Sequence, residues 1–301
     1  TKTPVPVEEP TPTSTPEAEY AANHISDNKI KYHCYDNKRD LIYFNIENDK
    51  CIKSFNPQTE EISDVLSLEE LKYYEDGGYY ENARMSAPMS VPASQLLYDS
   101  LNDRLYMRVA YQNFIDPNDY EPAEKIKVMA ILYDLNSGEY TQEINTVEPL
   151  FFLTKDKYIS YRQLREASLS KAFYTDYDNT YRYGNASQAI YKDGKIYYIC
   201  KNGDYYKGFC VADLADDKVE QRKIEKTFKD TWTNDGECFY FISSKNEIIK
   251  YELNGKMTKL LDLSTVENKD YRGFTGKMYK CSNNRYCFIG DDGLKLIKKI
   301  N

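Results

Sequence analysis

The chain has 301 residues but only two histidines and one tryptophan, and none of its seven cysteines forms a CxxC pair. Zinc sites draw their ligands from clustered Cys and His side chains, so this scarcity argues against bound zinc. No apolar run approaches the roughly 18 residues that a membrane-spanning helix needs. The composition therefore predicts no membrane span in this chain.

Dense clusters of basic residues are missing as well. Lys and Arg together number 40 against 48 Asp and Glu, which gives a formal net charge of -8. A field of this sign repels polyphosphates, so we do not expect nucleic acid as a partner. The charge is interpreted as an aid to solubility.

Signatures of common catalytic sites are also lacking, since the chain has no GxSxG elbow, no phosphate-binding loop and no GxGxxG turn. Asp176, Asp178 and Asn179 resemble the start of a calcium loop that lacks its later glycine and glutamate. We predict no metal, no cofactor and no catalytic residue. His24 lies at the edge of the N-terminal linker, and His33 is expected as a hydrogen-bonded structural residue on an inner strand.

What the chain does contain is a pattern that recurs six times: a tight turn with Asp or Asn, followed by a short β-prone run. The turn residues are Asp40, Asp103, Asp156, Asp193, Asp235 and Asn284. The aligned strand positions are Tyr43, Tyr106, Ile159, Tyr197, Phe239 and Cys287, spaced by 63, 53, 38, 42 and 48 residues. All-β repeats of about 40–50 residues are typical of propeller blades. The sequence therefore predicts an all-β fold, a single β-propeller.

Six aligned strands predict six blades, although the two longest spacings leave seven or eight open. The last blade stops at its third strand near Asn301, so we expect residues 20–26 to supply its outer strand and close the ring. One short helix is predicted over 67–74, where Ser67 and Glu70 have capping-box spacing.

Residues 1–19 contain five Pro and five Thr with interspersed acidic residues. Such a segment cannot bury enough apolar surface to fold, so it predicts a disordered linker ahead of a propeller domain at 20–301. A Pro/Thr stalk is typical of surface proteins and indicates an extracellular or cell-envelope location, tethered through an upstream anchor or lipid. A cloning scar or an intracellular interdomain linker is the alternative.

The odd number of cysteines argues against a complete disulfide framework. Cys200 and Cys210 flank a hairpin centred on Tyr205, so a disulfide there is one interpretation. The other is that they are small buried hydrophobes. The 30 tyrosines likewise indicate either β-structure or aromatic platforms for a ligand.

Three features carry a family resemblance that covers roughly residues 25–301. They are the segment YDLNSGEY (133–140), the repeated D-(G)-x-x-[IL]-Y-Y and the Pro/Thr leader. The chain resembles exported bacterial β-propellers of unknown function, which are similar to the propeller of the low-density lipoprotein receptor-related proteins. Those receptors repeat Tyr-Trp-Thr-Asp, whereas this chain has one tryptophan, in TWTND (231–235). The resemblance implies a surface or lipoprotein location and no assigned activity.

Three long insertions stand out, at 67–94, 111–126 and 163–170. Loops between strands b and c, and between d and the next a, emerge on one face of a propeller, so these insertions share a face. Long loops on a rigid scaffold concentrate binding residues. The predicted ligand-binding residues are Tyr73, Tyr74, Tyr79, Tyr80, Tyr111, Phe114, Tyr120 and Arg165. The alternative is that these rings pack the loops onto the body.

These observations favour a non-enzymatic, surface-tethered or secreted binding or scaffold propeller that recognises a protein or glycan ligand as a monomer. Two alternatives stay open. One is a secreted carbohydrate-active hydrolase or lyase with carboxylates in the propeller channel. The other is the extracellular sensor domain of a membrane protein whose anchor lies upstream of residue 1.

Overall fold

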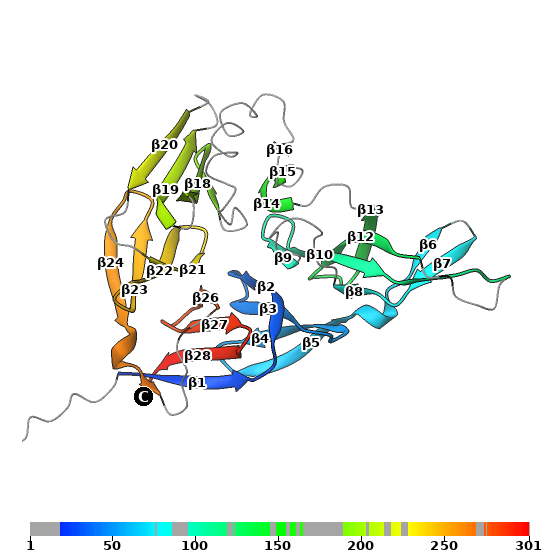
Figure 1. Cartoon of the computed structure of the whole chain (residues 1–301), viewed down its shortest axis with the longest axis horizontal. Coiled ribbons are helices and arrows are strands. Elements are labelled where there is room, and N and C mark those ends of the chain that lie inside the picture. The colour runs from blue at the N-terminus through cyan, green and yellow to red at the C-terminus, as the bar shows by residue number, and fades with distance from the viewer. Residues whose placement is uncertain are drawn as a thin grey trace, which may run out of the picture.

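Nearly all regular structure in this chain is β-strand, and the strands form antiparallel sheets arranged around a common axis as the blades of a β-propeller (Figure 1). The prediction of the fold is confirmed. The computed structural model describes residues 19–75, 77–85, 96–118, 123, 125–144, 149–154, 157–160, 163–164, 189–202, 205–213, 218–223, 228–268, 274 and 276–300.

The first three blades follow the order of the chain, from the axis outward. Blade one contains β2 (Ile30–Asp36), β3 (Leu41–Ile46), β4 (Cys51–Asn56) and β5 (Glu61–Ser67). Blade two contains β9 (Leu96–Asp99), β10 (Arg104–Tyr111), β12 (Lys127–Asp134) and β13 (Tyr140–Ile144), and β8 (Arg84–Met85) also pairs with β10. Blade three contains β14 (Pro149–Thr154), β15 (Lys157–Ser160) and β16 (Gln163–Leu164).

The remaining blades complete the circle. Blade four contains β17 (Ile190–Lys192), β18 (Lys195–Asn202), β19 (Tyr205–Asp213) and β20 (Lys218–Lys223). Blade five contains β21 (Phe228–Asn234), β22 (Cys238–Ser243), β23 (Glu247–Glu252) and β24 (Met257–Asp262). Blade six contains β26 (Lys277–Lys280), β27 (Tyr286–Gly290), β28 (Gly293–Lys299) and β1 (Tyr20–Ser26), with β25 (Glu267–Asn268) outside β1.

The ring closes through the N-terminal strand, as predicted. β1 pairs antiparallel with β28, with Tyr20 opposite Lys299 and Ala22 opposite Ile297. Blade six is thus built from both ends of the described chain, which protects an edge that would otherwise be open. The predicted linker at 1–19 falls almost wholly outside the described residues.

A recurrent Asp-capped turn explains why the repeat begins with acidic residues. The Asp36 carboxylate accepts from the amides of Lys38 (2.9 Å) and Arg39 (3.1 Å), and Asp40 then has φ 55°. Asp and Asn tolerate this left-handed conformation better than most residues. Asp99 caps the turn before Asp103, at φ 57°, in the same way. The positive φ values of Asp193 and Asn284 confirm the predicted turns in blades four and six as well.

The buried apolar side chains lie between neighbouring blades. One cluster joins blade one to blade two through residues such as Ile52 and Leu105. A second joins blade six to blade one through Phe44 and Leu296, and further clusters join blades five and six and blades four and five. At these four seams the blades are therefore stabilised mainly by burying their facing surfaces against each other.

The predicted helix at 67–74 is corrected to a single 3₁₀ turn, η1 (Leu68–Glu70), and the side chain of Ser67 makes no capping hydrogen bond. Leu68 and Leu71 are both fully buried and anchor this turn, and the tyrosines after it pair in a strand. β-prone tyrosines with a pairing partner thus override the capping signal. A second 3₁₀ turn, η4 (Leu263–Thr265), follows β24.

The described cysteines include both disulfide-bonded and free side chains. Cys210 is disulfide-bonded, whereas Cys34, Cys51, Cys238, Cys281 and Cys287 are free thiols. The side chain of Cys200, the partner named in the hairpin hypothesis, lies outside the described part. Within the described ranges, no helix has the length and hydrophobicity of a membrane span.

Candidate functional site

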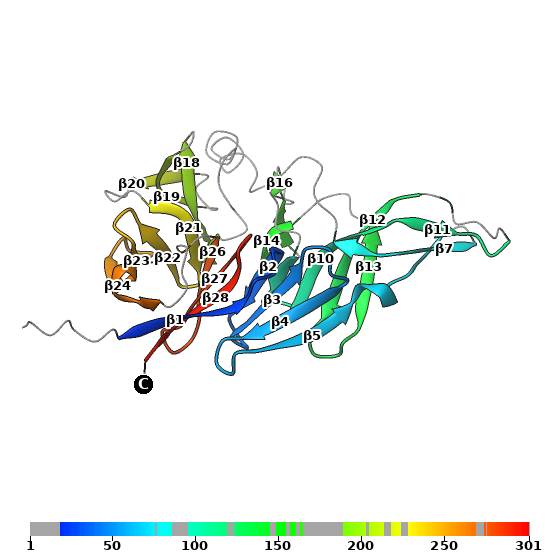
Figure 2. The ribbon, with the colours of Figure 1, turned by 60° about the horizontal axis from the view of Figure 1, so that its bottom comes forward.

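Two of the three predicted insertions meet in one small sheet beside blade two. In the first, β6 (Tyr73–Glu75) and β7 (Gly78–Glu81) form a hairpin. From the second, β11 (Asn113–Ile115) pairs with the other side of β7. We call these three strands the tyrosine sheet. It extends from blade two away from the ring (Figures 1 and 2). Only residues 163–164 of the third insertion are described.

The inward face of the tyrosine sheet carries Tyr73, Tyr80 and Phe114, which lie opposite one another on the three strands. Ring centroids are 5.0 Å apart for Tyr80 and Phe114 and 6.2 Å apart for Tyr73 and Tyr80. Tyr73 also lies 6.5 Å from Tyr111, which is fully buried in the core between blades one and two. This face therefore fixes the sheet to the body of the propeller.

A glycine pair makes this packing possible. Gly77 has φ 78°, a conformation that suits glycine at the hairpin turn. A Cβ atom on Gly78 would lie 2.4 Å from the carbonyl oxygen of Ile115 and 2.5 Å from the ring of Phe114. Only glycine lets β7 and the ring of Phe114 approach so closely.

The outward face carries Tyr74, Tyr79 and Ile115, since side chains alternate along each strand. The rings of Tyr74 and Tyr79 lie side by side with centroids 5.8 Å apart, and Tyr74 is 70% exposed. The Nζ atom of Lys72 lies 4.6 Å from the Tyr79 centroid. Two adjacent phenol rings beside a cation can stack on a sugar or an apolar side chain and attract an acidic group.

Charged side chains tie the tyrosine sheet to blade two. The ammonium of Lys127 on β12 donates to both carboxylate oxygens of Glu75 on β6, at 2.8 and 2.7 Å. This hydrogen bond raises the pKa of Lys127 above its ordinary value. The ammonium of Lys125 lies 4.4 Å from the centroid of Phe114. Apolar and ionic contacts together hold the outward face in one orientation.

The structure thus brings together five of the eight predicted ligand-binding residues, Tyr73, Tyr74, Tyr79, Tyr80 and Phe114. Tyr120 and Arg165 lie outside the described residues. Tyr111, the first residue of the predicted insertion 111–126, is the last residue of β10; it is fully buried and donates from its hydroxyl to Gln142 at 3.1 Å. Side chains at every second position from Met107 to Tyr111 are buried, and Tyr111 is the last of them. Its burial therefore follows from the alternation of side chains along a strand.

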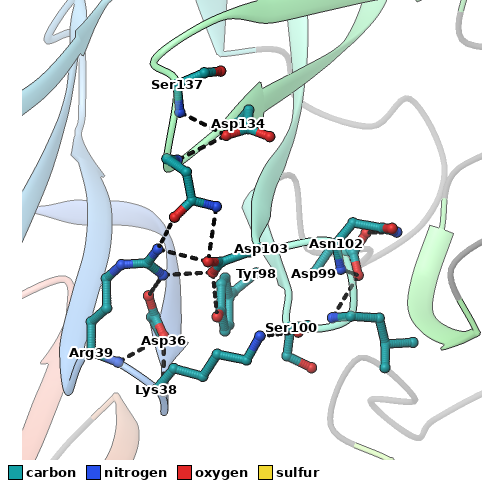
Figure 3. Close-up of polar contacts among 12 residues, drawn as sticks. Asp36, Lys38, Arg39, Tyr98, Asp99, Ser100, Asn102, Asp103, Asp134 and Ser137 are labelled. Carbon is teal, nitrogen blue, oxygen red and sulfur yellow. Dashed lines mark hydrogen bonds and ion pairs between the residues drawn. The ribbon is translucent and has the colours of Figure 1, made fainter.

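A polar network of charged and hydrogen-bonding side chains joins blades one and two at their a–b turns (Figure 3). These turns lie on the face opposite the b–c and d–a loops. The guanidinium of Arg39 donates to both oxygens of Asp103, at 2.6 and 2.8 Å. It also donates to Asp36 (3.0 Å) and to Asn136 (3.1 Å), and the hydroxyl of Tyr98 donates to Asp103 (2.9 Å). The hydrogen bonds from Arg39 hold the pKa of Asp103 well below its usual range.

This polar network is structural support for the blade that carries the tyrosine sheet. Every donor that faces Asp36 and Asp103 comes from a turn or strand of blades one and two, so the carboxylates are satisfied internally. The sequence signal for it is the spacing YDNKRD (35–40) and YDSLND (98–103), which repeats in blades one and two. The six-fold repeat of turn residues contains only the second Asp of each segment, Asp40 and Asp103.

A third group surrounds the axis, where the innermost strands of blades one, five and six meet (Figure 1). The Nδ1 atom of His33 lies 2.8 Å from the hydroxyl of Tyr279, which fits the predicted structural role of His33. Burial, aided by the charge of Lys277, lowers the pKa of His33 to about 3. The Nζ atom of Lys277 lies 5.5 Å from the centroid of Trp232, and burial lowers its pKa to about 7.

No three His, Cys, Asp or Glu side chains within the described ranges are grouped so that they could hold a metal ion. Residues 176–179, which resemble the start of a calcium loop, lie outside those ranges. The axial lysine was missed in the sequence because nothing in KMYK distinguishes Lys277 from an ordinary surface lysine. Lys72, the cation beside the outward face, could be suspected from the sequence only because it directly precedes two tyrosines.

Comparison with known proteins gives similarity to solved structures alone. No protein-family model and no curated protein matches this sequence. A streptogramin B lyase is 8% identical, with a TM-score of 0.38 over 94% of this chain and 100% of that chain. TolB from Acinetobacter baumannii is 9% identical, with a TM-score of 0.32 over 91% and 55%. An oligogalacturonate lyase from Vibrio parahaemolyticus is 9% identical, with a TM-score of 0.36 over 91% and 79%. The resemblance to exported bacterial propellers stays a prediction.

Proposed function

We propose that this chain is a surface-tethered or secreted binding propeller that recognises a protein or glycan through the outward face of the tyrosine sheet. The observation that carries the proposal is the adjacent pair of exposed Tyr74 and partly buried Tyr79 on the outward face of a sheet whose reverse face is packed against the body. A single exposed tyrosine is ordinary. A pair held rigidly in place loses little entropy on binding, which is how tyrosine serves in recognition surfaces.

Two observations support an extracellular or envelope location. Cys210 is disulfide-bonded, and such bonds persist in oxidising compartments. The segment before β1 is rich in Pro and Thr, as linkers to a surface anchor are. An upstream transmembrane helix with a cytosolic domain in the full gene would favour the sensor alternative instead.

The test begins with the purified chain on a glycan array and on an array of synthetic peptides. Affinity for each hit is then measured by calorimetry for the native chain and for the double variant Tyr74→Ala/Tyr79→Ala. We expect affinity to fall at least about tenfold, or about 1.4 kcal/mol, with the melting temperature unchanged. Tyr191→Ala is the matched control, because Tyr191 is 41% exposed on β17, in another blade. It should change neither property.

Equal affinity in the native chain and the double variant would place the binding site elsewhere. The enzyme alternative is tested with the same preparation, by incubating the array glycans in solution and analysing the products. Hydrolysis or elimination of any of them would overturn a purely binding role.

A further inference from the structure

Cys281 and Cys287 form a close pair of buried thiols in blade six. Their Sγ atoms are 3.7 Å apart, and the two residues are 1% and 0% exposed. Cys287 lies on β27 opposite Tyr279, and the amide of Cys281 donates to the carbonyl of Arg285 at 2.9 Å just beyond β26. Both side chains therefore lie on one face of the same hairpin.

The turn between these cysteines is the part of blade six that docks on blade one. The amide of Ser282 donates to the Asp40 carboxylate at 3.0 Å. The side chain of Asn283 donates to that of Gln58 at 2.9 Å, and the guanidinium of Arg285 donates to the Gln58 carbonyl at 3.0 Å. This is the seam at which the last blade of the ring meets the first.

We propose that Cys281 and Cys287 are an oxidation site: they form a disulfide when the chain folds in the presence of a disulfide oxidant, and the bond fastens the turn that joins blade six to blade one. A disulfide needs the sulfur atoms about 1.7 Å closer than the thiols now lie. Cys281 lies in the turn outside the regular ladder, so it can make this small shift without breaking strand pairing.

The reaction balances by thiol–disulfide exchange. One cysteine thiolate attacks the oxidant's disulfide and forms a mixed disulfide, releasing one oxidant thiol. The second cysteine thiolate then displaces the other oxidant sulfur as a thiol. Two protein thiols are oxidised and one oxidant disulfide is reduced to two thiols. Because both cysteines are buried in the folded ring, exchange takes place before blade six packs against blade one.

Tryptic peptide mapping tests the proposal directly, because cleavage after Lys280, Arg285 and Lys295 separates the two cysteines. The full chain is denatured, reduced and refolded with oxidised and reduced glutathione, then blocked with iodoacetamide in denaturant, which exposes buried thiols, and digested without reductant. We expect peptides 281–285 and 286–295 to appear as one linked species that separates on reduction. Refolding without glutathione disulfide should give both peptides alkylated. Alkylated peptides in both preparations, or a link from either cysteine to Cys34, would overturn the proposal.

A stability measurement adds a second readout. The oxidised chain should melt about 5 °C above the reduced chain, as expected for closing a short loop in a protein of this size. Cys287→Ser should reduce that difference to the part contributed by the disulfide of Cys210, whereas Cys34→Ser, which removes another buried free thiol, should leave the whole difference intact. An equal difference in both variants would show that the gain comes from another bond.

Discussion

The contact between Arg39 and Asp103 offers the sharpest test of how the blades are held together. Arg39→Ala removes two hydrogen bonds to Asp103 and one each to Asp36 and Asn136. The Arg39 side chain is 31% exposed and that of Asp103 24%, whereas Asp36 is fully buried. The variant therefore leaves a buried carboxylate without its cation, although its backbone amide donors remain.

The magnitude follows from these contacts. A hydrogen bond to a charged group contributes about 1.5–3 kcal/mol, and solvent screening reduces this for half-buried partners. We expect Arg39→Ala to lower the free energy of unfolding by about 2–3 kcal/mol. In a double-mutant cycle with Asp103→Asn, the coupling should be about 1–2 kcal/mol. Arg39→Lys should recover only part of the loss, because an ammonium cannot form the two-pronged contact.

Urea unfolding at pH 7 and at pH 3 measures these quantities. Because the folded pKa of Asp103 lies below its unfolded value of 3.8, the unfolded chain takes up the proton first. The stabilisation is therefore complete above about pH 5 and is lost as the pH falls below 4, and Arg39→Ala should flatten this decline. Lys50→Ala, which breaks an exposed ion pair with Glu69, is the control and should cost less than about 1 kcal/mol. A coupling below about 0.3 kcal/mol would show that the contact between blades is not held by this network.

Two further predictions concern the axis and the tyrosine sheet. The folded pKa of Lys277, about 7, lies below its unfolded value of 10.5, so this residue should add stability as the pH rises from 7 to 10. In urea unfolding the native chain should therefore gain stability over this range relative to Lys277→Met, and identical pH profiles for the two would contradict the assignment. Gly78→Ala should push β11 away from β7, because its Cβ would collide with Ile115 and Phe114, and hydrogen exchange of the amides at 78–81 and 113–115 should speed up more than tenfold. Gly77→Ala, which meets no atom within 4 Å, should have the smaller effect.

The propeller could be read from the sequence because its repeat rests on local chemistry. A tight turn with an Asp at a left-handed position needs only the residues of that turn, as at Asp40 and Asp103. The closing strand was predictable for a similar reason, since an incomplete last blade leaves an edge to be covered. The pairing of β11 was not, because β11 forms only when the second insertion meets the hairpin of the first, with Phe114 opposite Tyr80.

The sequence could predict which residues form the candidate site, but not which of them lie on each face of the tyrosine sheet. The sequence predicts Tyr73, Tyr74, Tyr79 and Tyr80 together, and only the register of the hairpin places Tyr73 and Tyr80 on the inward face and Tyr74 and Tyr79 on the outward face. A shift of one residue would exchange them. The pKa of Lys277 is likewise invisible in the sequence, because it depends on burial among strands from three different blades.

The pairing of β1 with β28 also decides how the ring would respond to mechanical load. Tyr20 lies opposite Lys299, and the amide of Ile300 donates to the carbonyl of Glu19, so both ends of the described chain leave from one corner. A pull between those two ends would unzip the pair one hydrogen bond at a time. A pull between residue 19 and a partner held on the tyrosine sheet runs nearly along β1 (Figure 1). That direction shears β1 against β28 and loads all of their hydrogen bonds at once, which is the stronger geometry for a tethered binding module.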